Sequence, residues 1–278
     1  MKFSLIIATL GREKELYNLF ESLVNQLYKN FEVIVVDQNE DSRVKKCVEK
    51  YRNLIEIKYL KSEVKGASYN RNKGLGLVSG DIVAFTDDDC IYDSLLLETV
   101  KSDFVNKNVD FLSYMIVDPL NGKLLSNYPL NEIKITTKNM FKCTMCASIF
   151  IKYKEKSDLY FDEEFGVGST YGSCEDSDLI FKIINYGHRG MFIPEKLIYH
   201  PSKTYPPKTG YTYGVGLGAF IKKTIVVYKR YDLLFFYLGE LIKAMGGIIV
   251  RKEKRKYYYY TLKGRIQGFI NYKSFITK

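Results

Sequence analysis

Three consecutive aspartates, Asp87, Asp88 and Asp89, follow a short apolar segment at residues 81–85. Such a segment is typical of a buried strand, so we expect three carboxylates to leave the C-terminal end of one strand together. Carboxylates this close repel one another, and a hard divalent cation among their oxygens relieves the repulsion. The triplet therefore predicts a Mg²⁺ or Mn²⁺ site at the strand end, where open α/β sheets bind ligands. A solvated acidic loop is the alternative.

Other polar residues are expected at the same edge of the sheet. Thr9 and Arg12 come after the first apolar segment of the chain, and Asp37 ends the second. These side chains are suited to holding a nucleoside, although helix capping and turn formation would also explain Thr9 and Asp37. Arg71, within GASYNRNKG, adds a guanidinium whose planar fork suits diphosphate oxygens.

A second acidic group occurs in the segment CEDSDL. Glu175 and Asp176 stand where a loop is expected to become a helix, since apolar residues recur at helical spacing after them. The positive end of a helix dipole favours the ionised form of a carboxylate, which a general base requires. Capping of the helix is the alternative, and Asp178 is expected to serve the first turn. His200 follows a strand-like segment and is a candidate to complete a metal shell or contact a diphosphate.

The elements that must position these side chains alternate along the chain. Apolar segments predict strands at residues 2–8, 31–37, 55–60, 81–85 and 111–117. Helices are predicted between them, near residues 43–50, 67–77 and 95–105. The first helix is predicted from apolar residues on one face, namely Leu16, Leu19, Phe20, Leu23 and Leu27. This alternation indicates an α/β fold with a mostly parallel sheet and helices on both faces.

Four segments in this order resemble the family 2 glycosyltransferases. They are SLIIATLGR, VIVVDQNEDS, GASYNRNKGLGLVSGDIVAFTDDD and YGSCEDSDLIFKI, and the resemblance extends over roughly residues 3–200. It implies the GT-A fold, which is Rossmann-like and binds nucleotide sugars. It also implies transfer of a sugar from a nucleotide diphosphate donor to an acceptor hydroxyl, with inversion at the anomeric carbon and usually with a divalent metal.

The resemblance also implies roles for the donor-binding residues. Thr9 and Asp37 would line the base and ribose pocket, and Arg71 would help to hold the donor, with Arg12 nearby. This chain has Gln38 where many members have a second aspartate. An amide both donates and accepts hydrogen bonds, whereas a carboxylate only accepts. The identity of the base is therefore open, with uridine favoured.

The remaining roles concern the metal and the general base of the reaction. The outer aspartates of the triplet resemble the family's DxD motif, so Asp89 would ligate the metal directly and Asp87 would contact the ribose or the metal indirectly. Asp88 would have either of these two roles, and His200 is a further candidate metal ligand. Asp176 matches the base of the family's ED motif, next to Glu175.

Charge is unevenly distributed along the chain. Residues 204–278 carry 15 Lys plus Arg against 3 acidic residues, or +12, whereas residues 1–203 carry −2. We expect residues 1–203 to form the catalytic domain, with a nucleotide-binding half to about 117 and an acceptor-binding half from 118. Residues 204–278 are expected to form a basic helical extension. Its apolar stretch LLFFYLGELIKAMGGIIV contains Glu240 and Lys243, which favour a helix on an anionic membrane surface over one that spans it. Helices packed on the catalytic domain are the alternative.

The partners and location follow from these expectations. The N-terminus begins directly with a strand and shows no signal peptide, so a cytoplasmic enzyme at the inner face of the plasma membrane is expected. Cys143 and Cys146 are interpreted as reduced, buried strand thiols. The acceptor would be a glycan or lipid-linked glycan of bacterial surface polysaccharide synthesis. A nucleotidyltransferase would need a glycine-rich basic signature after the first strand, and a nucleic-acid-binding module would leave both acidic groups unexplained, so no nucleic acid is expected.

Overall fold

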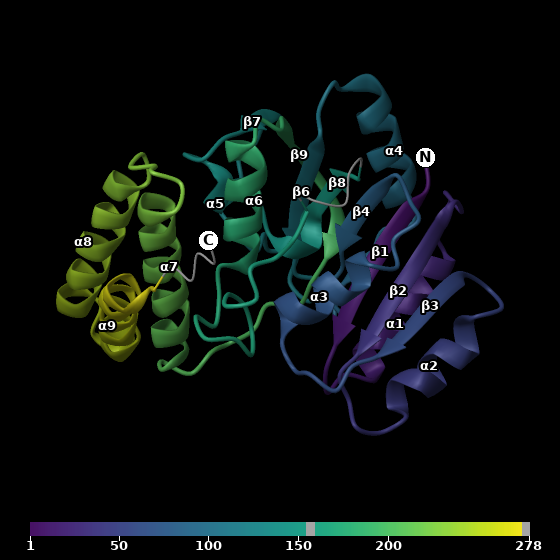
Figure 1. Cartoon of the computed structure of the whole chain (residues 1–278), viewed down its shortest axis with the longest axis horizontal. Helices are drawn as coiled ribbons and strands as arrows, with labels where there is room; N and C mark the ends of the chain where they lie inside the picture. Colours follow the sequence, from purple (N-terminus) through teal and green to yellow (C-terminus); the bar gives the residue numbers. More distant parts are fainter. Residues whose placement is uncertain (154–158, 274–278) are drawn as a thin grey trace. The chain divides into compact units, whose positions relative to one another are not determined.

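The computed structural model describes residues 1–153 and 159–273, which form two compact units (Figure 1). The first, here called the sheet unit, comprises Met1–Phe161 and Leu179–Ser202. The second, here called the helical unit, comprises Asp162–Asp178 and Lys203–Lys278. The assignment of donor and acceptor binding to residues 1–117 and 118–203, with a separate extension from 204, stays a prediction.

The sheet unit is built on one mixed sheet in the order β3-β2-β1-β4-β8-β6-β9-β5, with β7 pairing with β9. Four strands on one side are parallel: β1 Phe3–Thr9, β2 Phe31–Asp37, β3 Glu56–Lys61 and β4 Ile82–Phe85. The strand β6 Phe111–Val117 runs parallel to β9 Gly190–Tyr199. The antiparallel members are β5 Ile91–Tyr92, β7 Ile133–Ile135 and β8 Ile149–Lys152. The predicted α/β fold with a mostly parallel sheet is confirmed.

Helices cover both faces of the parallel strands. Alternate residues of β1 and β2 pack with α1 Lys14–Val24, α2 Arg43–Tyr51 and α4 Leu96–Asn106 in one apolar core. The helix α3 Ala67–Leu75 packs on the other face, against β1 and β2. Its Gly74 is needed there, because an added Cβ would lie 2.5 Å from a methyl carbon of Ile6. These contacts place the loops after β1, β2 and β4 at one edge of the sheet.

Two details differ from the sequence-based expectations. Leu27 is not on the buried face of the first helix, because α1 ends at Val24 and Leu27 is 60% exposed. The buried side chain of Gln26 bonds the Asp93 carbonyl and the Leu97 amide, which draws the chain out of the helix before Leu27. The thiols of the CxxC segment are buried and reduced, but they lie in short helical turns, α5 Met140–Cys143 and the 3₁₀ turn η1 Cys146–Ser148, rather than in strands.

A buried carboxylate joins three strands at the edge opposite the strand ends that carry the aspartates. Glu32, in β2, is fully buried and accepts hydrogen bonds from Ser4 at 2.6 Å and from the Ser79 amide at 2.8 Å. It also pairs with Lys58 at 2.7 Å and Lys2 at 3.2 Å. Burial alone would raise the pKa of Glu32, but the bonds from Lys58 and Ser4 outweigh it and lower the pKa to about 2.

Glu32 should therefore make the stability of the protein depend on acid pH. A lowered folded-state pKa contributes stability that is complete above the ordinary value of 4.5 and is lost as the pH falls toward 2. At neutral pH, Glu32→Gln should lose about 3 kcal/mol of unfolding free energy, at 1.36 kcal/mol per pKa unit. Denaturant titrations over a pH series should show the gap between wild type and variant closing in acid. Glu49→Gln, at an exposed helical position, is the control and should change little.

The helical unit contains three long helices, α7 Thr209–Val226, α8 Leu234–Val250 and α9 Arg255–Asn271, with the 3₁₀ turn η2 Lys252–Lys254 between the last two. Glycines allow α7 and α9 to approach closely. A Cβ added at Gly264 would lie 2.2 Å from the Tyr211 carbonyl oxygen, and one at Gly268 would lie 2.0 Å from that of Val215. Within residues 1–153 and 159–273, none of the helices combines the length and apolarity needed to cross a bilayer.

Gly264→Ala should destabilise the helical unit, because its methyl group would force two helix backbones apart. We expect a loss of about 1–3 kcal/mol, the usual cost of overpacking a well-packed contact. Gly246→Ala in α8 is the matched control, since nothing lies within 4 Å of its added Cβ. That change should raise stability by up to about 1 kcal/mol through helix propensity. Thermal unfolding monitored by circular dichroism measures the stability of both variants. Equal stabilities of the two variants would contradict the packing argument.

Candidate active site

The aspartate triplet lies at the carboxyl edge of the parallel strands. β1 runs parallel to β2 and to β4, and Thr9 and Asp37 are in register at the ends of β1 and β2. The triplet follows β4 after one residue, so all of these side chains leave the sheet at the same edge. The Thr9 hydroxyl donates to Asp88 Oδ2 at 2.7 Å. The structure thus brings the ends of β1 and β2 and the loop after β4, which are distant in sequence, to one edge of the sheet.

The aspartates of the triplet have arginine partners, one of which, Arg12, lies near both Asp88 and Asp89. Arg71 donates to Asp87 Oδ1 at 2.9 Å, and Arg12 donates to Asp89 Oδ2 at 2.9 Å. Burial raises the pKa of Asp88 to about 6, and the charges of Asp89 and Asp87 add to the rise, which Thr9 and Arg12 only partly offset. When all three carboxylates are ionised, their negative charge exceeds the positive charge of Arg12 and Arg71, and a bound cation would offset the excess.

His200 follows the end of β9 and faces the triplet. Its Nδ1 lies 2.9 Å from the Pro201 carbonyl oxygen, which only accepts, so Nδ1 carries a proton. The other ring nitrogen, Nε2, lies 3.0 Å from Asp89 Oδ1 and 4.0 Å from Asp87 Oδ2. A neutral imidazole would present a lone pair to these oxygens. The Nε2 lone pair and the carboxylate oxygens repel one another unless a proton or a metal cation lies between them.

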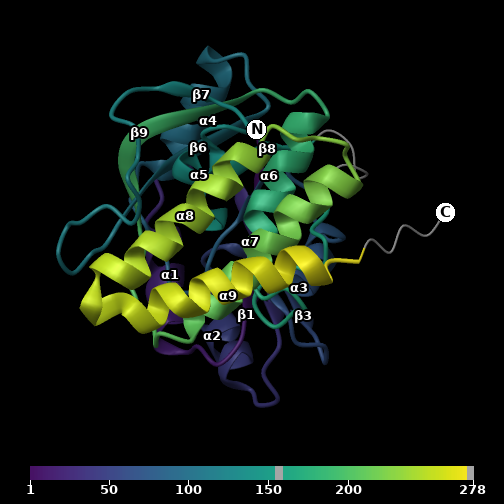
Figure 2. The same ribbon diagram turned by 90° about the vertical axis from the view of Figure 1, so that its left-hand side faces the viewer.

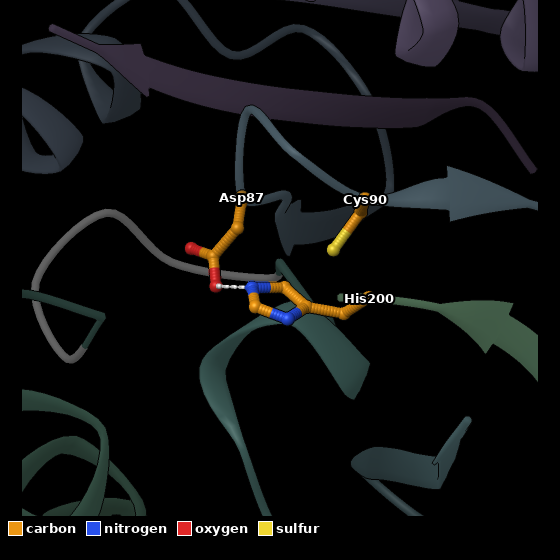
Figure 3. Close-up of side chains that lie close together, drawn as sticks. All are labelled: Asp87, Cys90 and His200. Carbon is orange, nitrogen blue, oxygen red and sulfur yellow. Dashed lines mark ion pairs between the residues drawn. The ribbon is translucent and has the colours of Figure 1, made fainter. Parts of the chain in front are cut away.

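The chemistry of this donor set fits a hard divalent cation. The ligand atoms of Asp87, Cys90 and His200 all lie within 4.8 Å of one another, and Figure 3 shows their side chains converging on one region. Asp89 reaches the same imidazole. Carboxylate oxygens and imidazole nitrogen suit Mn²⁺, whereas thiolate sulfur suits softer ions. Burial raises the pKa of Cys90 well above 9.0, so its thiol is neutral. Asp87, Asp89 and His200 are therefore the residues that would hold the cation.

Asp37 is fully buried and organises the neighbouring loop. It accepts hydrogen bonds from Tyr59 at 2.7 Å, from Lys61 at 3.0 Å, and from the backbone and side-chain nitrogens of Asn39 at 2.8 Å each. Burial raises the pKa of Asp37, but these donors outweigh it and the net shift is downward, so the carboxylate is ionised. The Asn39 side chain in turn accepts from the Gly11 amide at 2.6 Å. Asp37 thus fixes the shape of the loop after β1.

Sequence reasoning missed Asn39, Tyr59 and Lys61 as parts of this network. One signal was available, because Lys61 ends β3 directly opposite Asp37 in the parallel register.

Gln38, which stands where many family members have a second aspartate, has a structural role: its side-chain oxygen accepts a hydrogen bond from the Gly66 amide at 2.8 Å. That bond ties the loop after β2 to the residue before α3, the helix that carries Arg71.

The second acidic group begins α6 Glu175–Asn185, whose first turn belongs to the helical unit. Glu175 and Asp176 are half-buried, and Asp176 Oδ1 accepts from the Ser177 amide at 2.7 Å. The turn before them requires two left-handed residues, Gly172 at φ 64° and Cys174 at φ 67°. A non-glycine residue is uncommon in that region, and such strain often accompanies functional sites.

Asp178 lies in the first turn of α6, as expected, and it also takes part in a buried ion cluster. It is 1% exposed and accepts from Lys223 Nζ at 2.7 Å, while Asp162 accepts from the same nitrogen at 2.7 Å. All three residues belong to the helical unit. Sequence reasoning missed Lys223. The signal that could have found it is the pair Lys222 and Lys223 within an otherwise apolar helical segment, which indicates that one of the two lysines is buried.

Comparisons with known proteins agree on one family. The family described as "Glycosyl transferase family 2" matches residues 4–153. The poly(ribitol-phosphate) beta-N-acetylglucosaminyltransferase TarS of Staphylococcus aureus is 27% identical over 214 residues, which are 73% of this chain and 36% of TarS. The chain therefore spans about a third of the length of that relative.

Solved structures resemble the fold over nearly the whole chain. The crystal structure of S. aureus TarS 1–349 in complex with UDP-GlcNAc matches with a TM-score of 0.68 at 20% identity, covering 97% of this chain and 82% of that one. The mannosyltransferase PcManGT of Pyrobaculum calidifontis, in complex with GDP-Man and Mn²⁺, matches with a TM-score of 0.66 at 14% identity, covering 98% and 88%. The GT-A fold predicted from the sequence is confirmed.

Proposed function

Because this chain belongs to glycosyltransferase family 2, we propose that it transfers a sugar from a nucleotide diphosphate sugar to a hydroxyl group of a glycan or lipid-linked glycan. The observation that supports this most strongly is the convergence of Asp87, Asp89 and His200 at the carboxyl edge of a nucleotide-binding sheet. A UDP-sugar is the favoured donor, because TarS binds UDP-GlcNAc in its crystal structure. A GDP-sugar is the second choice, from the mannosyltransferase.

The donor would be held by the residues at the sheet edge. Thr9, Asp37 and the loop that Asp37 organises would surround the nucleoside, and Asp88 would contact the ribose or a nearby hydroxyl. Arg71, 7% exposed and fixed over the Phe161 ring at 5.5 Å, presents a rigid guanidinium suited to the diphosphate. Arg12 adds a second positive charge beside Asp89.

Asp87, Asp89 and His200 would hold Mn²⁺ or Mg²⁺. A cation bound there supplies positive charge where negative charge develops on the departing diphosphate. The protein's own contribution is to fix the ligands in advance: the Pro201 carbonyl orients the imidazole, and Arg12 and Arg71 orient the two carboxylates. The ligands therefore need little reorganisation when the donor binds.

Asp176 would act as the general base, with Glu175 beside it. The acceptor hydroxyl attacks the anomeric carbon, its proton passes to the Asp176 carboxylate, and the bond from the anomeric carbon to the diphosphate oxygen breaks. Displacement from the opposite side inverts the configuration. The position of Asp176 in the first turn of α6 supports this role, since the helix dipole favours its ionised form.

The enzyme is further proposed to act in bacterial surface polysaccharide synthesis, at the cytoplasmic face of the membrane. Residues 204–278, which carry a net charge of +12, support a location beside anionic lipids, where lipid-linked acceptors reside.

A donor screen tests the proposed function. Thermal shift of the purified chain should be measured with UDP-, GDP- and other nucleotide sugars, with and without Mn²⁺. We expect one donor class to raise the melting temperature only with metal, and slow hydrolysis should release the nucleoside diphosphate. Asp89→Asn should remove the metal-dependent part of the thermal shift, whereas Asp41→Asn, a surface change, should leave it intact. Failure of every donor to shift the wild type would contradict the proposal, and consumption of a nucleoside triphosphate with release of pyrophosphate would favour a nucleotidyltransferase.

A further inference from the structure

The helix α8 has two faces of different character. Its inner face packs on α9 through Tyr237, whose ring stacks on Phe269 at 5.3 Å, and through Glu240, which pairs with Arg265 at 2.5 Å. Ala244 is buried, and Gly247 continues the same face. These positions recur every three or four residues, as one side of a helix requires. Glu240, which interrupts the apolar stretch in sequence, thus lies on the protein side of the helix.

The opposite face of α8 is apolar and exposed. It consists of five residues, here called the outer stripe: Phe235, Leu238, Ile242, Met245 and Ile249. Their spacing of three, four, three and four residues places them in one row. Phe235 is 83% exposed, Ile242 65% and Ile249 74%. Large apolar side chains contiguous on a surface mark a site of interaction with a partner or a membrane.

A basic segment adjoins the outer stripe. Five exposed cations, here called the basic turn, lie at and beyond the C-terminal end of α8: Arg251, Lys252, Lys254, Arg255 and Lys256. Figure 2 shows α8 and α9 joined at this turn. Glu253 is the single acidic residue within it. An apolar row ending in a cluster of cations matches the two layers of a membrane surface, acyl chains below and anionic phosphates above.

We propose that the outer stripe of α8 inserts into the interface of an anionic membrane while the basic turn binds lipid phosphates. This deepens, and rests on, the proposed action on a membrane-bound acceptor. The charge of the helical unit favours lipid over a second copy of the chain, because a second copy would cover the outer stripe but would bring like charge to the basic turn. Insertion to the depth of one side-chain layer fits a helix whose other face packs on α9.

Single tryptophans can report the insertion directly, because the chain contains no tryptophan of its own. Ile242→Trp places a fluorophore in the middle of the outer stripe. On addition of vesicles containing phosphatidylglycerol, its emission should shift to the blue and should be quenched by lipids brominated along the acyl chain. Leu130→Trp, at an 81% exposed position in the sheet unit, is the matched control and should show neither change. Absence of both changes at residue 242 would overturn the proposal.

Vesicle flotation measures how much the outer stripe contributes. The wild type should float with equimolar phosphatidylcholine and phosphatidylglycerol, and much less with phosphatidylcholine alone or at high salt. The combined change Phe235→Ser, Ile242→Ser and Ile249→Ser should weaken binding at least about tenfold, because three apolar side chains no longer enter the interface. These positions are solvent-exposed, so the fold should be retained, which circular dichroism verifies.

A second triple variant controls for the loss of exposed apolar surface in general. Val105→Ser, Leu120→Ser and Leu130→Ser remove three side chains of similar exposure from the sheet unit and should leave flotation unchanged. Equal flotation of the stripe variant and wild type would overturn the proposal, as would a wild type that does not float and forms a dimer that the stripe variant abolishes. Donor-dependent thermal shift is measured separately, so loss of donor binding with flotation intact would count against the proposed function alone.

Discussion

Replacing Asp176 by asparagine is expected to lower the rate of sugar transfer by about 10²–10⁴-fold, the usual contribution of a general base. The amide is nearly the same size but cannot take the acceptor proton at neutral pH. Donor binding should be unchanged, because the donor site is assigned to residues of the sheet unit. The rate is measured as release of nucleoside diphosphate in the presence of acceptor, and donor binding by thermal shift with Mn²⁺.

The control for this variant is Asp41→Asn, which changes an exposed aspartate whose carboxylate pairs with Arg43 and whose backbone carbonyl accepts a hydrogen bond from Lys61. It should retain both transfer and donor binding. Full transfer by Asp176→Asn would remove that residue as the base, and Glu175→Gln would then be the next variant to measure. Loss of donor binding together with transfer would instead indicate a structural role for Asp176.

The largest effect on stability is expected from Lys223→Met. The substitution keeps the apolar stem of the side chain but leaves Asp162 and Asp178 without the ammonium group that both contact. Removing one partner from a buried ion cluster costs about 3–5 kcal/mol. Lys222→Met is the matched control, since the adjacent lysine is only half-buried and lies over the Phe269 ring at 5.1 Å. Denaturant unfolding should show a change below about 1 kcal/mol for the control.

The pH dependence of Lys223→Met gives an independent check. Burial lowers the pKa of Lys223, but the charges of Asp178 and Asp162 outweigh it, so the net pKa lies above the ordinary 10.5. A raised pKa contributes stability that is complete below 10.5 and is lost as the pH rises through the folded-state value. The gap between wild type and variant should therefore persist at neutral pH and narrow in strong alkali. A gap that is equally wide at every pH would indicate lost packing rather than lost charge.

Much of the sheet and its chemistry was predictable from local patterns. Strands β2 and β6 begin and end where the apolar runs do, because buried parallel strands are apolar on both faces. The aspartate triplet was recognisable because like charges at a strand end need a counter-ion. Leu27 shows the limit of periodicity, since it continues the apolar helical spacing but lies beyond the end of α1. The side-chain bonds of Gln26 decide that ending, and they involve residues about seventy positions away.

Residue types and short-range spacing were enough to predict the family, the main strands and helices over about residues 2–117, and the acidic groups from which a metal site and a base are proposed. They did not predict the short elements β5, β7, α5 and β8. The folded chain sets which partners those groups have: Arg12 for Asp89, Lys223 for Asp178, and the Pro201 carbonyl, which holds the imidazole of His200 toward the triplet. It also decided that Glu240 faces α9 while the outer stripe faces solvent. Such pairings depend on distances between segments far apart in the chain, which local patterns do not contain.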